Sequence, residues 1–110
     1  MEIIRDEAEL QAILQREPGA LIVFGEPTCG VDNAVTPRLE ALVAARFPKL
    51  FMGYIDCQSA GDLCAQEGVY ALPVVRVYFE GRRFAERVRL LGLDELADEI
   101  ARPYGLMFDE

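Results

Sequence analysis

Three cysteines are the residues of this chain with the most distinctive chemistry. Cys29 stands in the segment EPTCGVDNAVTP (residues 26–37), and Cys57 and Cys64 follow with six residues between them. A cysteine thiolate is a nucleophile that attacks disulfides, so these residues indicate thiol–disulfide exchange. Cys29 also follows an apolar run and opens a predicted helix, where unpaired backbone N–H groups and the helix dipole favour the thiolate. We therefore take Cys29 as the candidate nucleophile.

Residue 32 is an aspartate, at the position where a second cysteine would complete a dithiol pair with Cys29. Its carboxylate opposes a second negative charge nearby, which works against the thiolate. As a functional group, Asp32 would carry a proton to or from Cys29. As a structural group, an acid in the first turn stabilises a helix by about 0.3–1 kcal/mol. Both interpretations stay open, and we keep Cys29 and Asp32 as the catalytic candidates.

Cys57 and Cys64 form a second candidate site, with two interpretations. Their spacing, between the end of a predicted strand and the next helix, allows a disulfide, and exchange between Cys57 and Cys29 is conceivable if a loop moves. Alternatively both are buried and reduced, because cysteine is among the most buried residue types and cytosolic thiols stay reduced.

The composition excludes several classes of site. The chain has no histidine, so a Cys-His or Ser-His-Asp catalytic unit is impossible and the usual zinc ligand sets are poorly supplied. A three-cysteine metal site lacks a clear fourth ligand. We expect no metal and no cofactor.

The charge and hydropathy pattern limits the partners. The net charge is −8, from 19 acidic and 11 basic residues, which disfavours nucleic acid. The first ten residues contain acids and no apolar signal region, and the longest apolar stretch, ALIVF, is far too short to span a membrane. We expect a cytoplasmic protein with no membrane partner, and 110 residues suit a single domain over residues 1–110.

The hydrophobic pattern predicts alternating helices and strands. Helical spacing runs from residue 5 up to the Pro18-Gly19 pair, and an Asp6–Glu9 capping pattern opens it. Further helices are predicted over 35–47, 60–69 and 94–105, and strands over 20–25, 49–56, 74–79 and 84–91. Glu80-Gly81 is the predicted turn between the last two strands. This order predicts an α/β fold, a three-layer α/β/α sandwich with a mixed central sheet.

Arg76 does not fit this pattern. It lies inside a strand that should be central, where an unpaired charge is costly. Either that face is poorly covered or an acid pairs with the guanidinium, and the sequence does not name the acid.

These features together resemble the thioredoxin family, over about residues 6–102. The resemblance is carried by the element order, the Cys-Gly pair between an apolar strand and a long helix, Pro37 eight residues after Cys29, and the segment GVYALPVVRVYFEG. It implies that Cys29 is the exposed nucleophile, that Pro37 kinks the helix, and that Asp56 is an acid near the active-site loop.

The same resemblance implies a substrate-binding surface. Pro73 matches the family's cis-proline, which faces the cysteine and helps to hold an extended peptide. The candidate substrate-binding residues are Gly30, Val31, Leu72 and Pro73.

The chain departs from the family at several linked positions. The family's Trp-Cys-Gly-Pro-Cys reads Thr-Cys-Gly-Val-Asp over residues 28–32, so the resolving cysteine and the tryptophan are absent. The family's buried aspartate and nearby lysine are Val23 and Met52 here. Losing both charges avoids an uncompensated buried charge, so we interpret them as one proton-handling unit that this protein lacks.

The resulting hypothesis is a redox protein with one active-site cysteine. It would perform thiol–disulfide exchange or mixed-disulfide chemistry on a protein or glutathione, and it would not be a standard dithiol reductase, since release needs an external thiol or Cys57. The alternative is a non-catalytic binding or chaperone-like module that uses the Pro73 surface. A one-cysteine glutaredoxin, indicated by residues 27–30, is disfavoured because its Gly-Gly segment after the hairpin strand is missing.

Overall fold

The computed structural model describes residues 1–27, 30–89 and 92–108, with the backbone alone described for 30–34. The five strands are β1 (Glu2–Ile3), β2 (Gly19–Gly25), β3 (Phe51–Asp56), β4 (Val74–Phe79) and β5 (Arg82–Val88). The four helices are α1 (Glu7–Arg16), α2 (Gly30–Arg46), α3 (Gly61–Gln66) and α4 (Leu93–Phe108).

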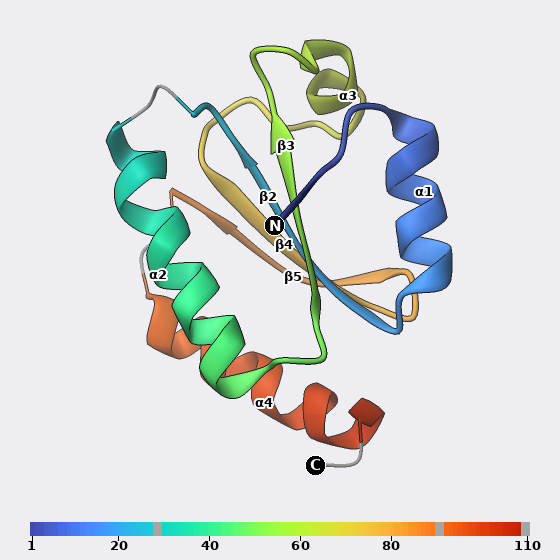
Figure 1. Ribbon diagram of the computed structural model, residues 1–110, viewed down its shortest axis with the longest axis vertical. Helices are drawn as coiled ribbons and strands as arrows, with labels where there is room; N and C mark the ends of the chain where they lie inside the picture. Colours follow the sequence, from blue (N-terminus) through green and yellow to red (C-terminus); the bar gives the residue numbers. More distant parts are fainter. Residues whose placement is uncertain (28–29, 90–91, 109–110) are drawn as a thin grey trace.

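The strands form one mixed sheet in the order β1-β3-β2-β4-β5 (Figure 1). β1 and β2 both pair with β3 in parallel, while β4 is antiparallel to β2 and β5 is antiparallel to β4. Parallel neighbours need a crossover, and α2 supplies it between β2 and β3. The sheet therefore combines parallel crossovers from the first half of the chain with a hairpin from the second half.

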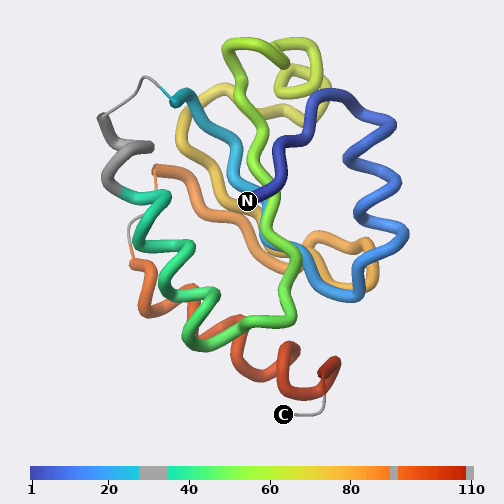
Figure 2. The backbone as a smooth tube through the Cα atoms, viewed as in Figure 1, coloured from blue at the N-terminus to red at the C-terminus, as the bar shows by residue number. Residues whose placement is uncertain are grey.

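Helices cover the two faces of the sheet, so the predicted three-layer α/β/α fold is confirmed. One apolar cluster joins α2 and α4 to inward residues of β2 and β4, including Leu21, Val23, Val75 and Val77. A second cluster joins α1 and α3 to the opposite face of the same strands. In Figure 2 the strands lie between α1 (blue) on one side and α2 (green) and α4 (red) on the other. All seven residues of β2 are buried, as expected for a strand covered on both sides.

Local signals explain where the helices begin and end. Asp6 caps α1 by accepting a hydrogen bond from the Glu9 N–H (2.8 Å), as the sequence pattern predicts. α2 contains Pro37, and α4 continues through Pro103 to Phe108, beyond the predicted end.

No helix within the described residues is long and apolar enough to cross a membrane.

Two strands differ from the sequence prediction. β1 was not predicted, because its two residues are too few to show a periodic pattern. The last strand, predicted over 84–91, runs instead from Arg82 to Val88. It begins directly after the turn, and it ends before Arg89, whose φ of 63° lies in the left-handed region.

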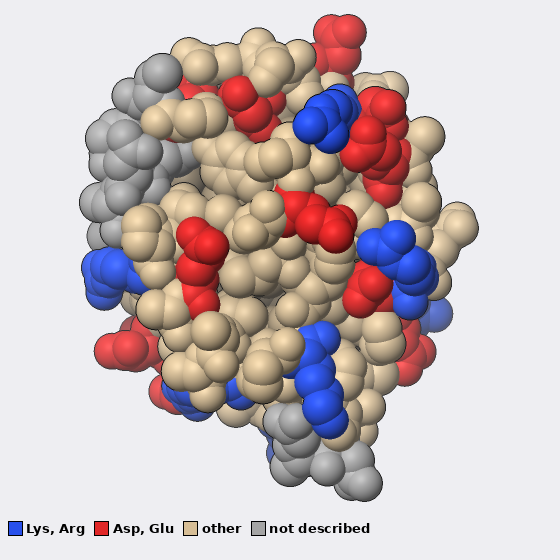
Figure 3. Space-filling view, in the orientation of Figure 1, with Lys and Arg blue, Asp and Glu red and all other residues tan. Residues whose placement is uncertain are grey.

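The hairpin between β4 and β5 turns at Glu80 and Gly81, where the sequence predicts it. Both residues have positive φ, 52° and 76°, as a type I′ turn requires. Gly81 adopts this conformation freely, but Glu80 carries a Cβ and is strained there. Figure 3 shows one face of the molecule, in the orientation of Figure 1, where acidic and basic side chains are scattered among neutral ones.

We predict that Glu80→Asn stabilises the protein by about 0.5–1 kcal/mol, because asparagine tolerates the left-handed region better than glutamate. Urea unfolding followed by circular dichroism measures the change. Glu80→Gln, which removes the same charge without relieving the backbone, should leave the midpoint unchanged. An equal gain in both variants would attribute the effect to charge and contradict the prediction.

Candidate functional site

The predicted nucleophile precedes α2 directly in the chain. Cys29 lies outside the described residues, as do the side chains of Gly30, Val31 and Asp32. The described backbone places the start of α2 at Gly30, immediately after Cys29. The role of Cys29 and Asp32 as a catalytic pair, and that of Gly30 and Val31 in substrate binding, therefore stay predictions.

The loop that carries Cys29 starts from the centre of the sheet. β2 ends at Gly25, which pairs in parallel with Asp56 at the end of β3. The Cys57 N–H then donates a hydrogen bond to the Gly25 carbonyl (2.8 Å). Since the carboxyl ends of parallel strands meet at one edge, Cys57 lies beside the strand end from which the Cys29 loop departs.

Cys57 and Cys64 are joined by a disulfide, with 5.8 Å between their Cα atoms. Cys64 is buried in the α1/α3 cluster, and half-buried Cys57 packs against that cluster. Of the two interpretations left open by the sequence, the structure has the oxidised one. In this state Cys57 has no free thiol, so it could resolve a mixed disulfide on Cys29 only after a two-electron reduction.

Asp56 precedes the disulfide and is held by its own turn. Its two carboxylate oxygens accept hydrogen bonds from the Gln58 N–H (2.9 Å) and the Ser59 hydroxyl (2.7 Å). The bond from Ser59, helped by that from Gln58, lowers the pKa of Asp56 and outweighs the opposing effect of burial. Asp56 is therefore a turn-forming carboxylate that stays ionised at neutral pH.

The second predicted surface is the loop before β4. The Leu72–Pro73 peptide bond is cis, and Leu72 packs against the α1/α3 cluster. The Pro73 carbonyl accepts a hydrogen bond from the Arg89 N–H (2.7 Å), which ties this loop to the end of β5. Tyr70, two residues earlier than Leu72, is 84% exposed. Substrate binding by Leu72 and Pro73 stays a prediction.

The two positions that are charged in thioredoxins are apolar here. Val23 belongs to the α2/α4 cluster, and Met52 packs against the same cluster. No carboxylate therefore occupies position 23, where the family resemblance implies a proton-handling acid.

A buried charge occurs instead on the opposite face of the sheet. Arg76 is 2% exposed, and its guanidinium donates to Glu86 Oε2 (2.6 Å), Glu67 Oε1 (2.9 Å) and the Glu67 carbonyl (2.6 Å). It also stacks over the Phe24 ring, 4.9 Å from the centroid. Burial works against the charge, but the bonds to Glu86 and the interaction with Tyr78 raise the pKa of Arg76. The side chain links β4, β5 and the C-cap residue of α3.

Glu7, on α1, adds a further carboxyl group beside Glu67 in this network. Burial raises the pKa of Glu67, Glu7 raises it further, and Arg76 only partly opposes the rise. Glu7 Oε1 accepts from Gln11 (3.0 Å), while Glu7 Oε2 is buried and has no hydrogen-bond partner among the described residues. A proton on Glu67 would supply a donor to the Glu7 carboxylate, which is why Glu7 raises the pKa of Glu67.

The sequence drew attention to Arg76 but did not identify its partners. With a two-residue turn at Glu80-Gly81, simple pairing puts Ala85 opposite Arg76. The register shifts by one residue between Val77 and Tyr78, which leaves Phe84 as the extra residue and puts Glu86 opposite Arg76. Glu67 comes from another element, and no local sequence signal connects it to β4.

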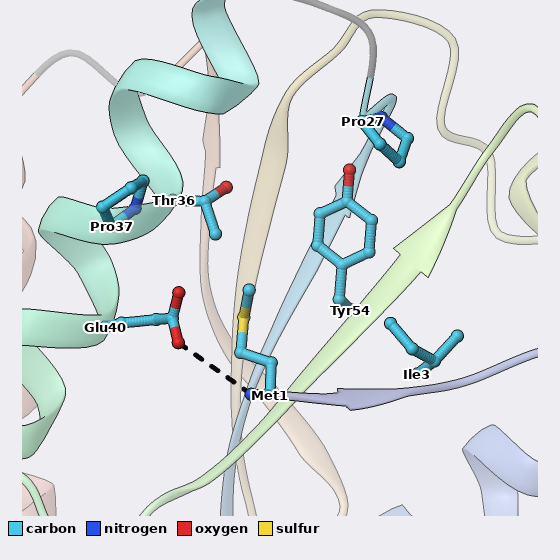
Figure 4. Close-up of a pocket in the computed structure, with 7 residues that line it drawn as sticks. All are labelled: Met1, Ile3, Pro27, Thr36, Pro37, Glu40 and Tyr54. Atoms are coloured by element: carbon cyan, nitrogen blue, oxygen red, sulfur yellow. Dashed lines mark ion pairs between the residues drawn. The ribbon is translucent and has the colours of Figure 1, made fainter.

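A hollow of about 320 Å³ lies between α2 and the β1/β3 edge (Figure 4). Its wall is mostly apolar, and the Met1 amino group approaches Glu40 Oε2 at 3.9 Å. None of the described residues that line it is a cysteine, and the part of the chain that the structure describes includes no group of three or more potential metal ligands.

The fold and this site define a class of protein: an α/β/α protein with a cysteine directly before α2 and a cis-proline loop before β4. A model of the thioredoxin family matches residues 2–102, so the chain belongs to the thioredoxin family.

Individual relatives are distant. The chain is 24% identical over 97 residues to the thioredoxin-like protein YdfQ of Bacillus subtilis, covering 88% of this chain and 86% of that protein. It is 32% identical over 72 residues to human DnaJ homolog subfamily C member 10, of which it spans only 9%. Its fold matches a thioredoxin from Plasmodium falciparum with a TM-score of 0.80 at 18% identity, covering 90% of this chain and 98% of that one.

The Arg76 network predicts a large loss of stability when its cation is removed. Arg76→Met leaves Glu67 and Glu86 without their counter-ion, at an expected cost of about 3 kcal/mol. Urea unfolding measures it. The triple variant R76M/E67Q/E86Q, which removes the orphaned charges too, should recover at least half of that loss. If the triple variant were as unstable as R76M, lost packing rather than unpaired charge would be the cause.

The raised pKa of Glu67 predicts an unusual pH dependence. Because the folded state binds this proton more tightly than the unfolded state, the stabilisation is fully present below the ordinary value of 4.5 and is lost as pH rises through the raised pKa. Glu67→Gln mimics the protonated form, since its amide donates towards Glu7 and its oxygen still accepts from Arg76. We expect E67Q to gain about 0.5–1.5 kcal/mol at pH 7 and nothing at pH 4.

Unfolding free energies of wild type and E67Q between pH 4 and 8 provide this measurement. Glu67→Ala is the control, because it removes the carboxyl group without replacing either hydrogen bond, and it should destabilise at every pH. A gain for E67Q that does not change with pH would contradict the raised pKa of Glu67.

Proposed function

We propose that this protein performs thiol–disulfide exchange with a protein partner through one nucleophilic cysteine, Cys29. The observation that carries the proposal is the start of α2 at Gly30 in a chain of the thioredoxin family. The residue before a helix adjoins unpaired N–H groups and the positive end of the dipole, which favour a thiolate. Residue 23 is a valine, so no carboxylate there can take the proton of the thiol, and we expect the helix end to be what favours the thiolate.

The exchange has two balanced steps. In the first, the Cys29 thiolate attacks one sulfur of the partner's disulfide, the partner's S–S bond breaks, and its second sulfur leaves as a thiolate that takes a proton from water. In the second, an external thiolate, such as that of glutathione, attacks the partner's sulfur in the mixed disulfide. The S–S bond to Cys29 breaks, Cys29 leaves as a thiolate, and the partner keeps a disulfide with the external thiol. Asp32 cannot perform this second step as a cysteine would, so resolution depends on a second molecule.

The Cys57–Cys64 disulfide supports the dependence on an external thiol. While the bond is intact, Cys57 has no thiolate with which to attack a mixed disulfide on Cys29. The protein would therefore hold partners in mixed disulfides for longer than a dithiol thioredoxin does. A non-catalytic binding module is the second candidate, favoured by the exposure of Tyr70 beside the cis-proline loop.

The first test compares wild type and Asp32→Cys in the reduction of insulin with dithiothreitol. We expect wild type to be slower than a dithiol thioredoxin by about tenfold or more, and Asp32→Cys to recover much of the difference, because it supplies the resolving thiol. Cys29→Ser should abolish mixed disulfides with glutathione, detected by mass spectrometry. The C57S/C64S variant is the matched control and should still form them.

Two results would contradict the proposal. Insulin reduction at the rate of a dithiol thioredoxin would show that resolution does not need a second molecule. Alkylation of Cys29 with an apparent pKa at or above about 8.5, together with partner binding unchanged in C29S, would favour the binding module.

A further inference from the structure

The basic residues of this acidic protein are concentrated on one strand. Residues 82–89 contain four arginines and one glutamate, a net charge of +3 in a chain whose net charge is −8. Arg82 and Arg89 form no ion pair within the described residues, whereas Arg83 and Arg87 pair with Glu86 and Glu99. The positive charge available to a partner is therefore at the two ends of β5.

This strand also lies at an edge of the sheet. β5 pairs with β4 on one side and is the last strand in the order, so among the described residues no strand neighbours its other side (Figures 1 and 2). An edge strand presents unpaired backbone N–H and C=O groups that an extended segment can use.

Apolar side chains accompany the arginines. Phe84 and Val88 are 45% and 49% exposed, and Tyr70, which lines a hollow together with Val88, is 84% exposed. Tyr70 and Val88 line a hollow of about 240 Å³ whose floor includes Val69 and Val74. Charged side chains on an edge strand protect it from aggregation, and the arginines of β5 are enough for that purpose. The exposed apolar groups on the same edge are not explained by protection, and they indicate a binding surface.

The backbone at one end of β5 supports this interpretation. Arg89 holds a left-handed conformation (φ 63°) that is costly for a residue with a Cβ. Its N–H bonds to the Pro73 carbonyl, so the strained residue presents a cation beside the cis-proline loop. The basic edge is thus continuous with the surface that the sequence assigns to substrate binding.

We propose that the β5 edge docks an extended, acidic segment of a partner protein by strand addition, with its carboxylates towards Arg82 and Arg89 and an apolar side chain in the Tyr70–Val88 hollow. A second copy of this chain fits poorly, because two β5 strands would bring like charges together. Docking is non-covalent and needs no thiol, so it goes beyond the proposed exchange at Cys29.

The test uses a fluorescein-labelled peptide of about ten residues that alternates glutamate with valine, long enough to pair along the seven residues of β5. Fluorescence anisotropy measures its binding to the full chain. Arg82→Glu with Arg89→Glu should weaken binding by about tenfold or more. Arg5→Glu with Arg38→Glu, which changes the net charge equally at exposed positions on other elements, should change it less than about twofold.

Further controls separate the alternatives. The neutral variant R82Q/R89Q should weaken binding less than the charge reversal does, and it is the milder change to the fold. Circular dichroism checks that every variant is folded. A peptide of the same composition with all glutamates before all valines should bind more weakly, because it cannot present both groups along one strand. Cys29→Ser should bind as wild type does, which separates docking from thiol chemistry.

The proposal is overturned if the alternating peptide does not bind, or if both arginine pairs weaken it equally. It is also overturned if the protein forms a dimer that R82E/R89E dissolves, or if a single-stranded oligonucleotide binds the same edge more tightly than the peptide.

Discussion

The burial of β2 on both faces is the constraint on which the rest of this structure depends. All seven of its residues are buried, and its two edges pair with β3 and β4. A strand of this kind has no freedom to shift, because a slip of one residue would exchange the side chains of the two apolar clusters. Its carboxyl end at Gly25 is therefore a rigid starting point for the loop that carries Cys29 and for the neighbouring Cys57.

The distribution of charge across the sheet separates this protein from the general thioredoxin pattern. The α2/α4 side contains Val23 and Met52, so no charge pair occupies these two positions. The α1/α3 side contains Arg76, paired with Glu67 and Glu86. A buried ion pair contributes little net stability compared with an apolar replacement, but losing one partner is costly. This network therefore restrains β4, β5 and α3 more than it strengthens the core.

The cysteine chemistry and the basic edge meet at one end of the sheet. Cys57 bonds to the end of β2, and Arg89 bonds to the Pro73 loop. Under the proposed exchange at one thiol, release of the partner would be slow, and a separate docking surface would decide which partner is held. The two proposals are thus compatible, although each rests on its own residues.

The sequence by itself determined the layers, the mixed sheet, the hairpin turn and the family, because these follow from apolar periodicity and local turn chemistry. It also located the cysteines and Arg76 as the residues that needed an explanation. Only the tertiary structure decided the partners of Arg76, Cys57 and Cys64. The one-residue register shift that puts Glu86 opposite Arg76, and the disulfide that joins Cys57 to Cys64, depend on how separate elements meet. Such contacts are set by packing between segments, and the residues near each position in the sequence do not encode them.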